Sequence, residues 1–284
     1  MQIEHDGVTL HVAEDGNPNG RVITFLHGIT SCANTWEWAL PDLVADHRVL
    51  RLDFRGHGDS DRAPGTYTFA NCVLDAVAVL DGLVGGPSVL VGHSLGGGTA
   101  AAIAQRRPDL VQAVLLEDPA IMTAAIEGTG DGEPNALIAG FTMMRQTIPM
   151  LQQSGVTLDA LVGILAESPG LDGRPFKDTM YPDAIVAMAS GLLRLDASVL
   201  DPALDGTLEA VFDPHAAIPA PGIVLAGDET DPSTIVRGRE KALLAANSPH
   251  VDVRIVSGAG HMIHDAFEHR EVMRAALWQL LASP

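Results

Sequence analysis

A buried apolar run that leads straight into a glycine-flanked serine restricts the possible folds more than any other feature. Residues 89–98 read VLVGHSLGGG, and the small-residue pattern TAAAIA follows at 99–104. β-branched apolar residues favour a buried strand, and the small apolar residues after it fit a closely packed helix. A Cβ at Gly92 or Gly96 would collide with a neighbouring strand or helix. The segment therefore predicts a sharp strand-to-helix turn that holds Ser94 in a strained conformation at its tip.

This turn also gives Ser94 a particular chemical setting. It lies at the start of a helix, where free N–H groups and the helix dipole favour developing negative charge. A Gly-x-Ser-x-Gly motif between a strand and a helix is the usual setting of a nucleophilic serine. Gly and Ser are common residues, so the specificity of the signal comes from the strand before the motif and the helix after it.

The rest of the chain alternates between strand and helix patterns. Apolar runs predict strands at 8–13, 21–26, 48–53, 110–116, 222–227 and 251–256, besides the strand that leads to Ser94. Helical periodicity predicts helices at 33–45, 69–83, 235–246 and 268–282. This order indicates an α/β fold, with a mostly parallel sheet covered by helices on both faces.

One long segment interrupts the alternation. Residues 120–214 have helical patterns rich in Ala, Leu, Ile and Met, and no convincing core strand. The sheet needs the strands on both sides of this segment. We therefore expect a core formed by residues 1–119 and 215–284, and a helical cap inserted at 120–214 over a ligand cleft. A separate small helical domain is the alternative.

The composition excludes several classes of partner. The chain has 36 acidic and 17 basic residues among 284, a net charge of −19. Nucleic acids and anionic membranes are excluded as partners, because both require clusters of Lys and Arg. Anionic substrates would be repelled at long range, which favours a neutral one. Cys32 and Cys72 give no metal-ligand spacing and no disulfide framework. Neither a signal peptide nor a membrane-spanning run is visible, so a cytoplasmic location is expected.

A serine hydroxyl needs a base to remove its proton and an acid to orient that base. His261 is the candidate base, because it lies in a Gly-rich loop directly after a predicted strand; His264 and His269 are its rivals. Asp231 is the candidate acid, since Pro232 restricts its conformation so that it could project toward His261. Asp228 is the main rival in the same loop.

An anionic acyl-transfer intermediate needs backbone N–H donors aimed at its oxygen. Leu95, the residue after the serine, should supply one of them. The other should be Ile29, in the loop after the strand at 21–26, where Gly28 gives the turn its freedom. His27, Arg55, His57 and His93 are interpreted as structural residues.

Several of these stretches together resemble the α/β-hydrolase superfamily, in particular its esterase, lipase-like and haloperoxidase-like branches. They are His27-Gly28, the loop 53–60, the motif 92–97, and Gly260-His261, and Ser94, Asp231 and His261 follow the family's chain order. The resemblance covers the chain except the cap. It implies an eight-stranded, mostly parallel sheet, a cap over the active site, and no cofactor or metal.

The resemblance also leaves alternatives open. In many relatives the acid follows the strand glycine by three residues, a place that Thr230 holds here. Other relatives carry the acid one strand earlier, where Glu117 or Asp118 could serve. The expected activity is hydrolysis of a small, neutral, largely apolar carboxylic ester through an acyl-enzyme on Ser94. Lactonase, thioesterase or amidase activity are alternatives, as are a ligand-binding receptor and a cyclase or lyase; the oligomeric state is left open.

Overall fold

A mixed sheet of eight strands organises the molecule. The computed structural model describes residues 1–121, 136–170 and 172–282. The strand order is β1-β2-β4-β3-β5-β6-β7-β8. The bounds are β1 Gln2–His5, β2 Val8–Gly16, β3 Arg21–Leu26, β4 His47–Leu52, β5 Ser88–His93, β6 Val111–Glu117, β7 Gly222–Ala226 and β8 Val251–Ile255. β1 and β2 are antiparallel to their neighbours, and the six strands from β4 to β8 run parallel. The predicted fold class is confirmed.

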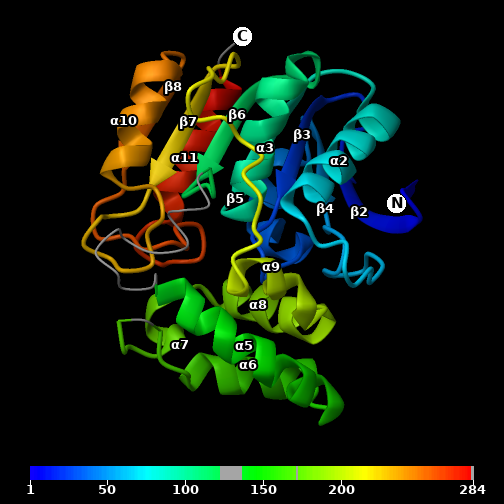
Figure 1. Ribbon diagram of the computed structural model, residues 1–284, viewed down its shortest axis with the longest axis vertical. Coiled ribbons are helices and arrows are strands. Elements are labelled where there is room, and N and C mark those ends of the chain that lie inside the picture. The colour runs from blue at the N-terminus through cyan, green and yellow to red at the C-terminus, as the bar shows by residue number, and fades with distance from the viewer. Residues whose placement is uncertain (122–135, 171, 283–284) are drawn as a thin grey trace.

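Helices cover both faces of this sheet (Figure 1). On one face, α2 (Phe69–Val79), α3 (Leu95–Arg106) and α10 (Gly238–Asn247) contribute to the larger apolar cluster. On the other, the 3-10 helix η1 (Ala33–Ala39), α1 (Leu40–Leu43) and α11 (Arg270–Leu281) pack against a second cluster. All six residues of β5 are buried, as expected for a strand covered on both faces. The strand that leads to Ser94 is thereby fixed on all sides.

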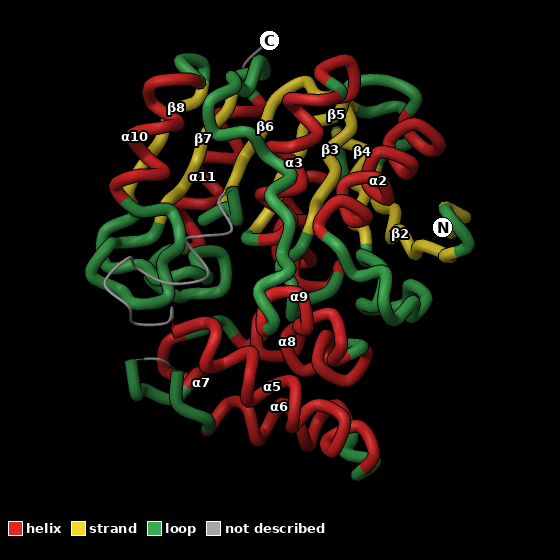
Figure 2. The backbone as a smooth tube through the Cα atoms, viewed as in Figure 1, coloured by secondary structure: helices red, strands yellow, loops and turns green. Residues whose placement is uncertain are grey.

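Among the described residues between β6 and β7, the long elements are helices. This segment contains α5 (Ala136–Gln153), α6 (Leu158–Glu167), α7 (Phe176–Thr179), α8 (Pro182–Arg194), η4 (Ala197–Leu200) and α9 (Asp201–Leu204). Figures 1 and 2 show this group below the ends of the parallel strands. Part of the predicted cap, residues 122–135, lies outside the described residues.

Backbone contacts join these helices to the loop after β8. Met180 forms a β-bridge with Ala266, and the Tyr181 N–H donates to the Asp265 carbonyl at 3.0 Å. The Phe267 N–H donates to the Thr179 carbonyl at 2.9 Å. The helical segment is therefore attached directly to the loop that carries His261.

Three predicted elements differ from the structure. The strand predicted at 8–13 extends to Gly16 as β2. It is not the edge of the sheet, because the unpredicted strand β1 pairs with its outer side. The helix predicted at 33–45 is a 3-10 helix followed by the single α-turn of α1, which begins at Leu40 with Pro41 in its first turn. Proline fits the first turn of a helix but not its interior, so a continuous helix cannot pass through this point. The helix predicted at 69–83 ends as an α-helix at Val79 and continues as the π-turn η2 (Leu80–Val84).

In the part of the chain that the structure describes, no helix combines the length and the apolar content needed to cross a membrane.

Candidate active site

Ser94 occupies the strained turn that its sequence predicts. It lies between the end of β5 and the start of α3, with φ 52° and ψ −113°. A Cβ added at Gly92 would lie 2.4 Å from the Gly96 carbonyl oxygen, and one at Gly96 would lie 2.1 Å from the Leu26 carbonyl oxygen. Both distances are far below van der Waals contact, so only glycine fits at either position. The two glycines allow the serine to be presented at the carboxyl end of the sheet.

Backbone hydrogen bonds hold this turn against the next strand. The Ser94 N–H donates to the Glu117 carbonyl at 3.0 Å, and the Ser94 carbonyl accepts from Gly98 and Ala120 at 2.9 Å. Ser94 is buried, with 7% of its surface exposed. The serine is therefore placed beside the end of β6, where Glu117 and Asp118 follow each other.

The side chain of His261 contacts the second of these carboxylates. His261 Nδ1 and Asp118 Oδ2 are 2.7 Å apart. The two oxygens of Asp118 also accept the backbone N–H groups of Ile235 and Val236, each at 2.9 Å. Asp118 is fully buried and has a positive φ of 36°, which turns the chain at the end of β6. A carboxylate bound to Nδ1 leaves Nε2 of the ring as the atom that can accept a proton.

The prediction that Asp231 faces His261 is wrong. Asp231 Oδ1 instead accepts the backbone N–H and the hydroxyl of Ser233, at 2.8 and 2.5 Å. The Ser233 hydroxyl oxygen in turn accepts the His261 backbone N–H at 3.0 Å. The physical reason is local: an aspartate that bonds a residue two positions ahead closes a turn on itself. Asp231 thus supports the backbone of His261 through Ser233 and does not reach its ring.

Asp228 and Glu117, two other candidate acids, bind groups other than the His261 ring. Asp228 accepts the backbone N–H groups of Gly258 and Thr230, which lower its pKa to about 2. Glu117 binds His264 and not His261. Of the four carboxylates weighed from the sequence, Asp118 is the one that contacts the His261 ring.

His93, the residue before Ser94, packs against His261. The His93 and His261 rings lie 4.6 Å apart, and His93 Nε2 is 3.0 Å from the His261 carbonyl oxygen. Among the described side chains, the Ser94 hydroxyl and the His261 ring form no hydrogen bond. Catalytic hydrogen bonds are often long in unliganded enzymes and tighten when substrate binds.

Ile29 and Leu95 present backbone N–H groups near the serine. Neither N–H finds an acceptor among the described residues. The Ile29 carbonyl, by contrast, is held by His57 Nε2 at 2.7 Å. A Cβ at Gly28 would lie 3.5 Å from Ser94 Cβ, so the loop passes close to the serine. This arrangement supports the prediction that the two N–H groups form an oxyanion hole.

These two residues also line one small cavity. It has a volume of about 20 Å³, and its walls include Tyr67, Phe69 and Val199. A volume of roughly 10–15 Å³ is enough for one water molecule. The cavity therefore has room for one water molecule or for a group of about that size.

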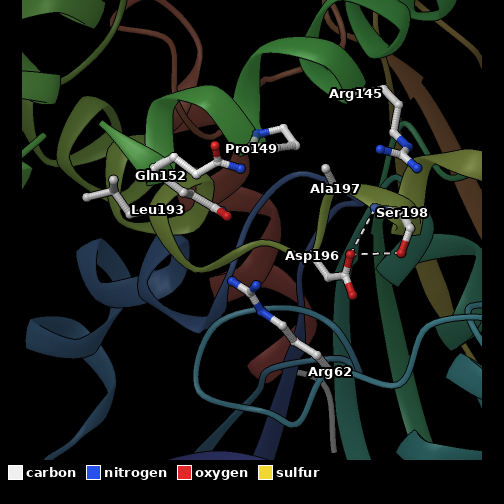
Figure 3. Close-up of a pocket in the computed structure, with 9 residues that line it drawn as sticks. Arg62, Arg145, Pro149, Gln152, Leu193, Asp196, Ala197 and Ser198 are labelled. Atoms are coloured by element: carbon white, nitrogen blue, oxygen red, sulfur yellow. Dashed lines mark hydrogen bonds between the residues drawn. The ribbon is translucent and has the colours of Figure 1, made fainter. Parts of the chain in front are cut away.

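A much larger cavity lies elsewhere, between α5, η4 and the loop that carries Arg62 (Figure 3). Its volume is about 540 Å³. It is lined by Arg62, Arg145, Pro149, Gln152, Gln153, Leu193, Asp196, Ala197 and Ser198. None of the candidate catalytic residues lines it, so size alone does not identify the reaction site.

His27 holds the loops around the serine, as the sequence analysis expects. Its Nε2 accepts the Phe54 N–H at 3.1 Å, and its Nδ1 donates to the Gly28 carbonyl at 2.8 Å. This pattern requires the neutral ring with its proton on Nδ1. Burial lowers the pKa of His27 to about 3.

A neutral buried histidine makes stability depend on pH. The unfolded chain takes up a proton at His27 below pH 6.5 and the folded chain only near pH 3, so stability present above pH 6.5 is lost as the pH falls toward 3. In His27→Gln the glutamine side chain can still accept the Phe54 N–H but does not titrate. We expect the free energy of unfolding of this variant to fall by about 2–3 kcal/mol less than that of the wild type between pH 6.5 and 4.5. Urea unfolding at several pH values measures this difference. The control is His215→Gln, a variant of an exposed histidine. Equal slopes for wild type and His27→Gln would contradict the assignment.

Comparison with known proteins identifies the family. A model of the alpha/beta hydrolase family matches residues 25–276. A 2-(acetamidomethylene)succinate hydrolase of Mesorhizobium japonicum is 28% identical over 270 residues, which cover 91% of this chain and 87% of that protein. The sn-1-specific diacylglycerol lipase ABHD11 of Mus musculus is 26% identical, covering 88% of this chain and 78% of that protein.

A solved structure agrees with these relatives. Est816, described as an N-acyl homoserine lactone degrading enzyme, superposes with a TM-score of 0.70 at 25% identity, over 98% of this chain and 99% of that one. The match of the family model to most of the chain, together with the eight-stranded sheet and the Ser94 turn, leads to one conclusion. The chain belongs to the alpha/beta hydrolase family.

Proposed function

We propose that this protein is a serine hydrolase that cleaves a small, neutral carboxylic ester through an acyl-enzyme on Ser94. The observation that carries the proposal is the contact of 2.7 Å between His261 Nδ1 and Asp118 Oδ2, beside a serine held at a positive φ. A buried carboxylate on one ring nitrogen orients the other nitrogen as a base. The triad of this proposal is Ser94, His261 and Asp118.

The first step forms the acyl-enzyme. His261 Nε2 takes the hydroxyl proton of Ser94 as its oxygen attacks the ester carbonyl carbon. The backbone N–H groups of Ile29 and Leu95 stabilise the negative charge that develops on the carbonyl oxygen. The imidazolium, stabilised by Asp118, then gives its proton to the departing alkoxide, which leaves as the alcohol.

The second step releases the acid. A water molecule gives a proton to His261 Nε2 and attacks the acyl carbon, and the same two N–H groups stabilise the second intermediate. Its collapse breaks the bond to Ser94, whose oxygen recovers the proton from His261. The cycle consumes one ester and one water and yields one acid and one alcohol.

The dimensions and charge of the site suggest the substrate class. The cavity of about 20 Å³ beside Ile29 and Leu95 favours a short acyl group. Residues 120–214 contain 13 acidic and 4 basic residues. This excess of negative charge disfavours an acyl group that bears its own carboxylate.

A substrate panel tests this selectivity. We expect p-nitrophenyl acetate to be hydrolysed with a kcat/KM at least about tenfold above that of p-nitrophenyl hydrogen succinate, because charge repulsion lowers the local concentration of the anion. The difference should shrink as salt is added, since screening weakens interactions between separated charges. Equal rates for the two esters, or a difference insensitive to salt, would argue against a neutral substrate.

A lactone is the second candidate substrate. Est816 is described as degrading N-acyl homoserine lactones, and the likeness to it covers nearly the whole of both chains. A lactone is a cyclic ester, so the same serine, base and oxyanion donors would open it. Including simple γ- and δ-lactones in the panel separates the two candidates.

Labelling with a fluorophosphonate tests the shared chemistry. The probe should modify Ser94 in the wild type, as located by mass spectrometry of peptides, and it should not modify His261→Ala at a comparable rate. A folded wild type that stays unlabelled would favour a binding protein over a hydrolase.

A further inference from the structure

A second histidine–carboxylate pair lies directly beside the first. Glu117 and Asp118 are consecutive at the end of β6, and each binds a histidine of the same short loop: Asp118 binds His261, and Glu117 binds His264. Glu117 Oε2 is 2.6 Å from His264 Nδ1, and its Oε1 accepts the His264 backbone N–H at 2.8 Å. Both residues are at most 1% exposed. The mechanism above uses only the first pair.

The surroundings of His264 fix the position of its ring and favour its protonated form. Its Nε2 lies 2.9 Å from Thr35 Oγ1 and 3.3 Å from Asp265 Oδ1, and Trp36 stacks on the ring with centroids 4.5 Å apart. Burial opposes protonation, but the Asp265 and Glu117 carboxylates together raise the pKa of His264. Burial also opposes a charged Glu117, but the histidines lower its pKa to about 2. The carboxylates thus favour the protonated form of His264, and the histidines favour the charged form of Glu117.

This pair is connected to the base through the loop and through His93. The His93 ring packs edge-on against His264 at 5.3 Å and tilted against His261 at 4.6 Å. The His261 backbone is held at its N–H by Ser233 and at its carbonyl by His93. Three residues later, Glu117 holds both the backbone and the ring of His264. Movement of the His264 anchor would therefore move the segment that carries the base.

Stability alone does not require an ion pair at this buried position. Desolvation opposes the burial of two charges, and well-packed apolar residues often stabilise a protein equally well. The pair does fix the orientation of the His264 ring and backbone, because both carboxylate oxygens and both ring nitrogens have hydrogen-bond partners. A catalytic base misplaced by about 1 Å can lose about 10²-fold in rate.

We propose that Glu117 and His264 are positioning residues for the base, and that they fix the turn 261–264 so that the His261 ring stays against Asp118 and within reach of Ser94. This inference rests on the proposed function. Neither residue touches the reacting atoms. Their effect is on the fraction of molecules in which the base is correctly placed, so it falls on kcat and on the rate of serine acylation, and KM for a small ester is unaffected.

Glu117→Gln and His264→Gln test the proposal. Glu117→Gln keeps the shape and one acceptor for the His264 N–H but removes the charge, and His264→Gln removes the ring. Each should lower kcat and the rate of fluorophosphonate labelling about 10- to 100-fold, with KM within about twofold of wild type. Two variants are used so that a folding failure in one does not decide the result.

A matched control distinguishes an effect on the position of the base from the general effect of removing a buried charge. Asp75 is another buried carboxylate, paired with Arg55 at 2.6 and 2.7 Å on the opposite side of the sheet from His264. Asp75→Asn should lower the midpoint of thermal unfolding and leave kcat of the folded protein within about threefold of wild type. All rates are measured well below the unfolding midpoint of each variant.

Proton NMR gives a reading that does not depend on turnover. The wild type should show downfield signals for the ring N–H protons of His261 and His264. Glu117→Gln should remove the His264 signal and also broaden or shift that of His261, whereas Asp75→Asn should leave both unchanged.

The outcomes are distinguishable. Normal kcat, labelling rate and His261 signal in folded Glu117→Gln and His264→Gln, with Ser94 labelled in the wild type, would overturn the positioning role and leave the proposed function standing. A wild type that is neither labelled nor active on any ester or lactone would overturn both.

Discussion

Replacing Ser94 with alanine should reduce kcat for p-nitrophenyl acetate by on the order of 10⁴-fold or more, with the fold intact. The acyl-enzyme needs an oxygen nucleophile at this point, and no other hydroxyl occupies the turn between β5 and α3. Alanine fits the same backbone space, although the positive φ of position 94 disfavours any residue with a Cβ. The measurement is steady-state hydrolysis together with circular dichroism and thermal unfolding.

The control for this variant is an exposed serine in the helical segment between β6 and β7. Ser154→Ala, directly after the end of α5, should retain wild-type activity. A Ser94→Ala protein that keeps more than a few per cent of wild-type kcat would remove Ser94 from the mechanism. The proposed acyl-enzyme would then have to be abandoned.

The second large effect is expected at Asp118, the proposed acid. Asp118→Asn should lower kcat/KM by about 10³- to 10⁴-fold, because an amide can donate to His261 Nδ1 and thereby stabilise the tautomer that carries its proton on Nε2. That tautomer cannot accept the proton of Ser94. Asp118 also accepts from Ile235 and Val236, so a lower unfolding midpoint is expected as well. Rates are therefore compared at a temperature where the variant is fully folded.

Asp231→Asn is the matched control, since it makes the same chemical change on the next strand end. Its remaining carbonyl oxygen can still accept from Ser233, so the loss in kcat/KM should stay below about tenfold. A larger loss for Asp231→Asn than for Asp118→Asn would return the role of acid to Asp231. The comparison decides directly between the two positions.

Much of the fold follows from local sequence patterns. The parallel strands are recognisable as short apolar runs, and β3 begins and ends at the predicted residues, Arg21 and Leu26. Buried strands in a sheet covered on both faces must be apolar throughout, and this is a strong local signal. The short edge strand β1 alternates between exposed and half-buried residues, so it carries no such signal.

The candidate nucleophile is likewise determined locally. Contacts within a few residues of Ser94 and with the adjacent strand β3 require the glycines at 92 and 96. The order of strand, turn and helix can be recognised in the amino-acid sequence alone. A turn of this kind permits few backbone conformations. Its place in the chain could therefore be predicted without knowledge of the distant parts of the structure.

The partner of His261 was decided only by the tertiary structure. Asp118 and Asp231 both follow strands that end at the same edge of the sheet, so sequence order allows either. Asp231 bonds to Ser233 in its own turn, whereas the positive φ of Asp118 and two N–H groups from the distant loop before α10 turn that carboxylate toward the histidine. Sequence determines which residues lie at the ends of strands, because burial and turn geometry are local. Which of them meet depends on side-chain directions set by contacts more than a hundred residues away.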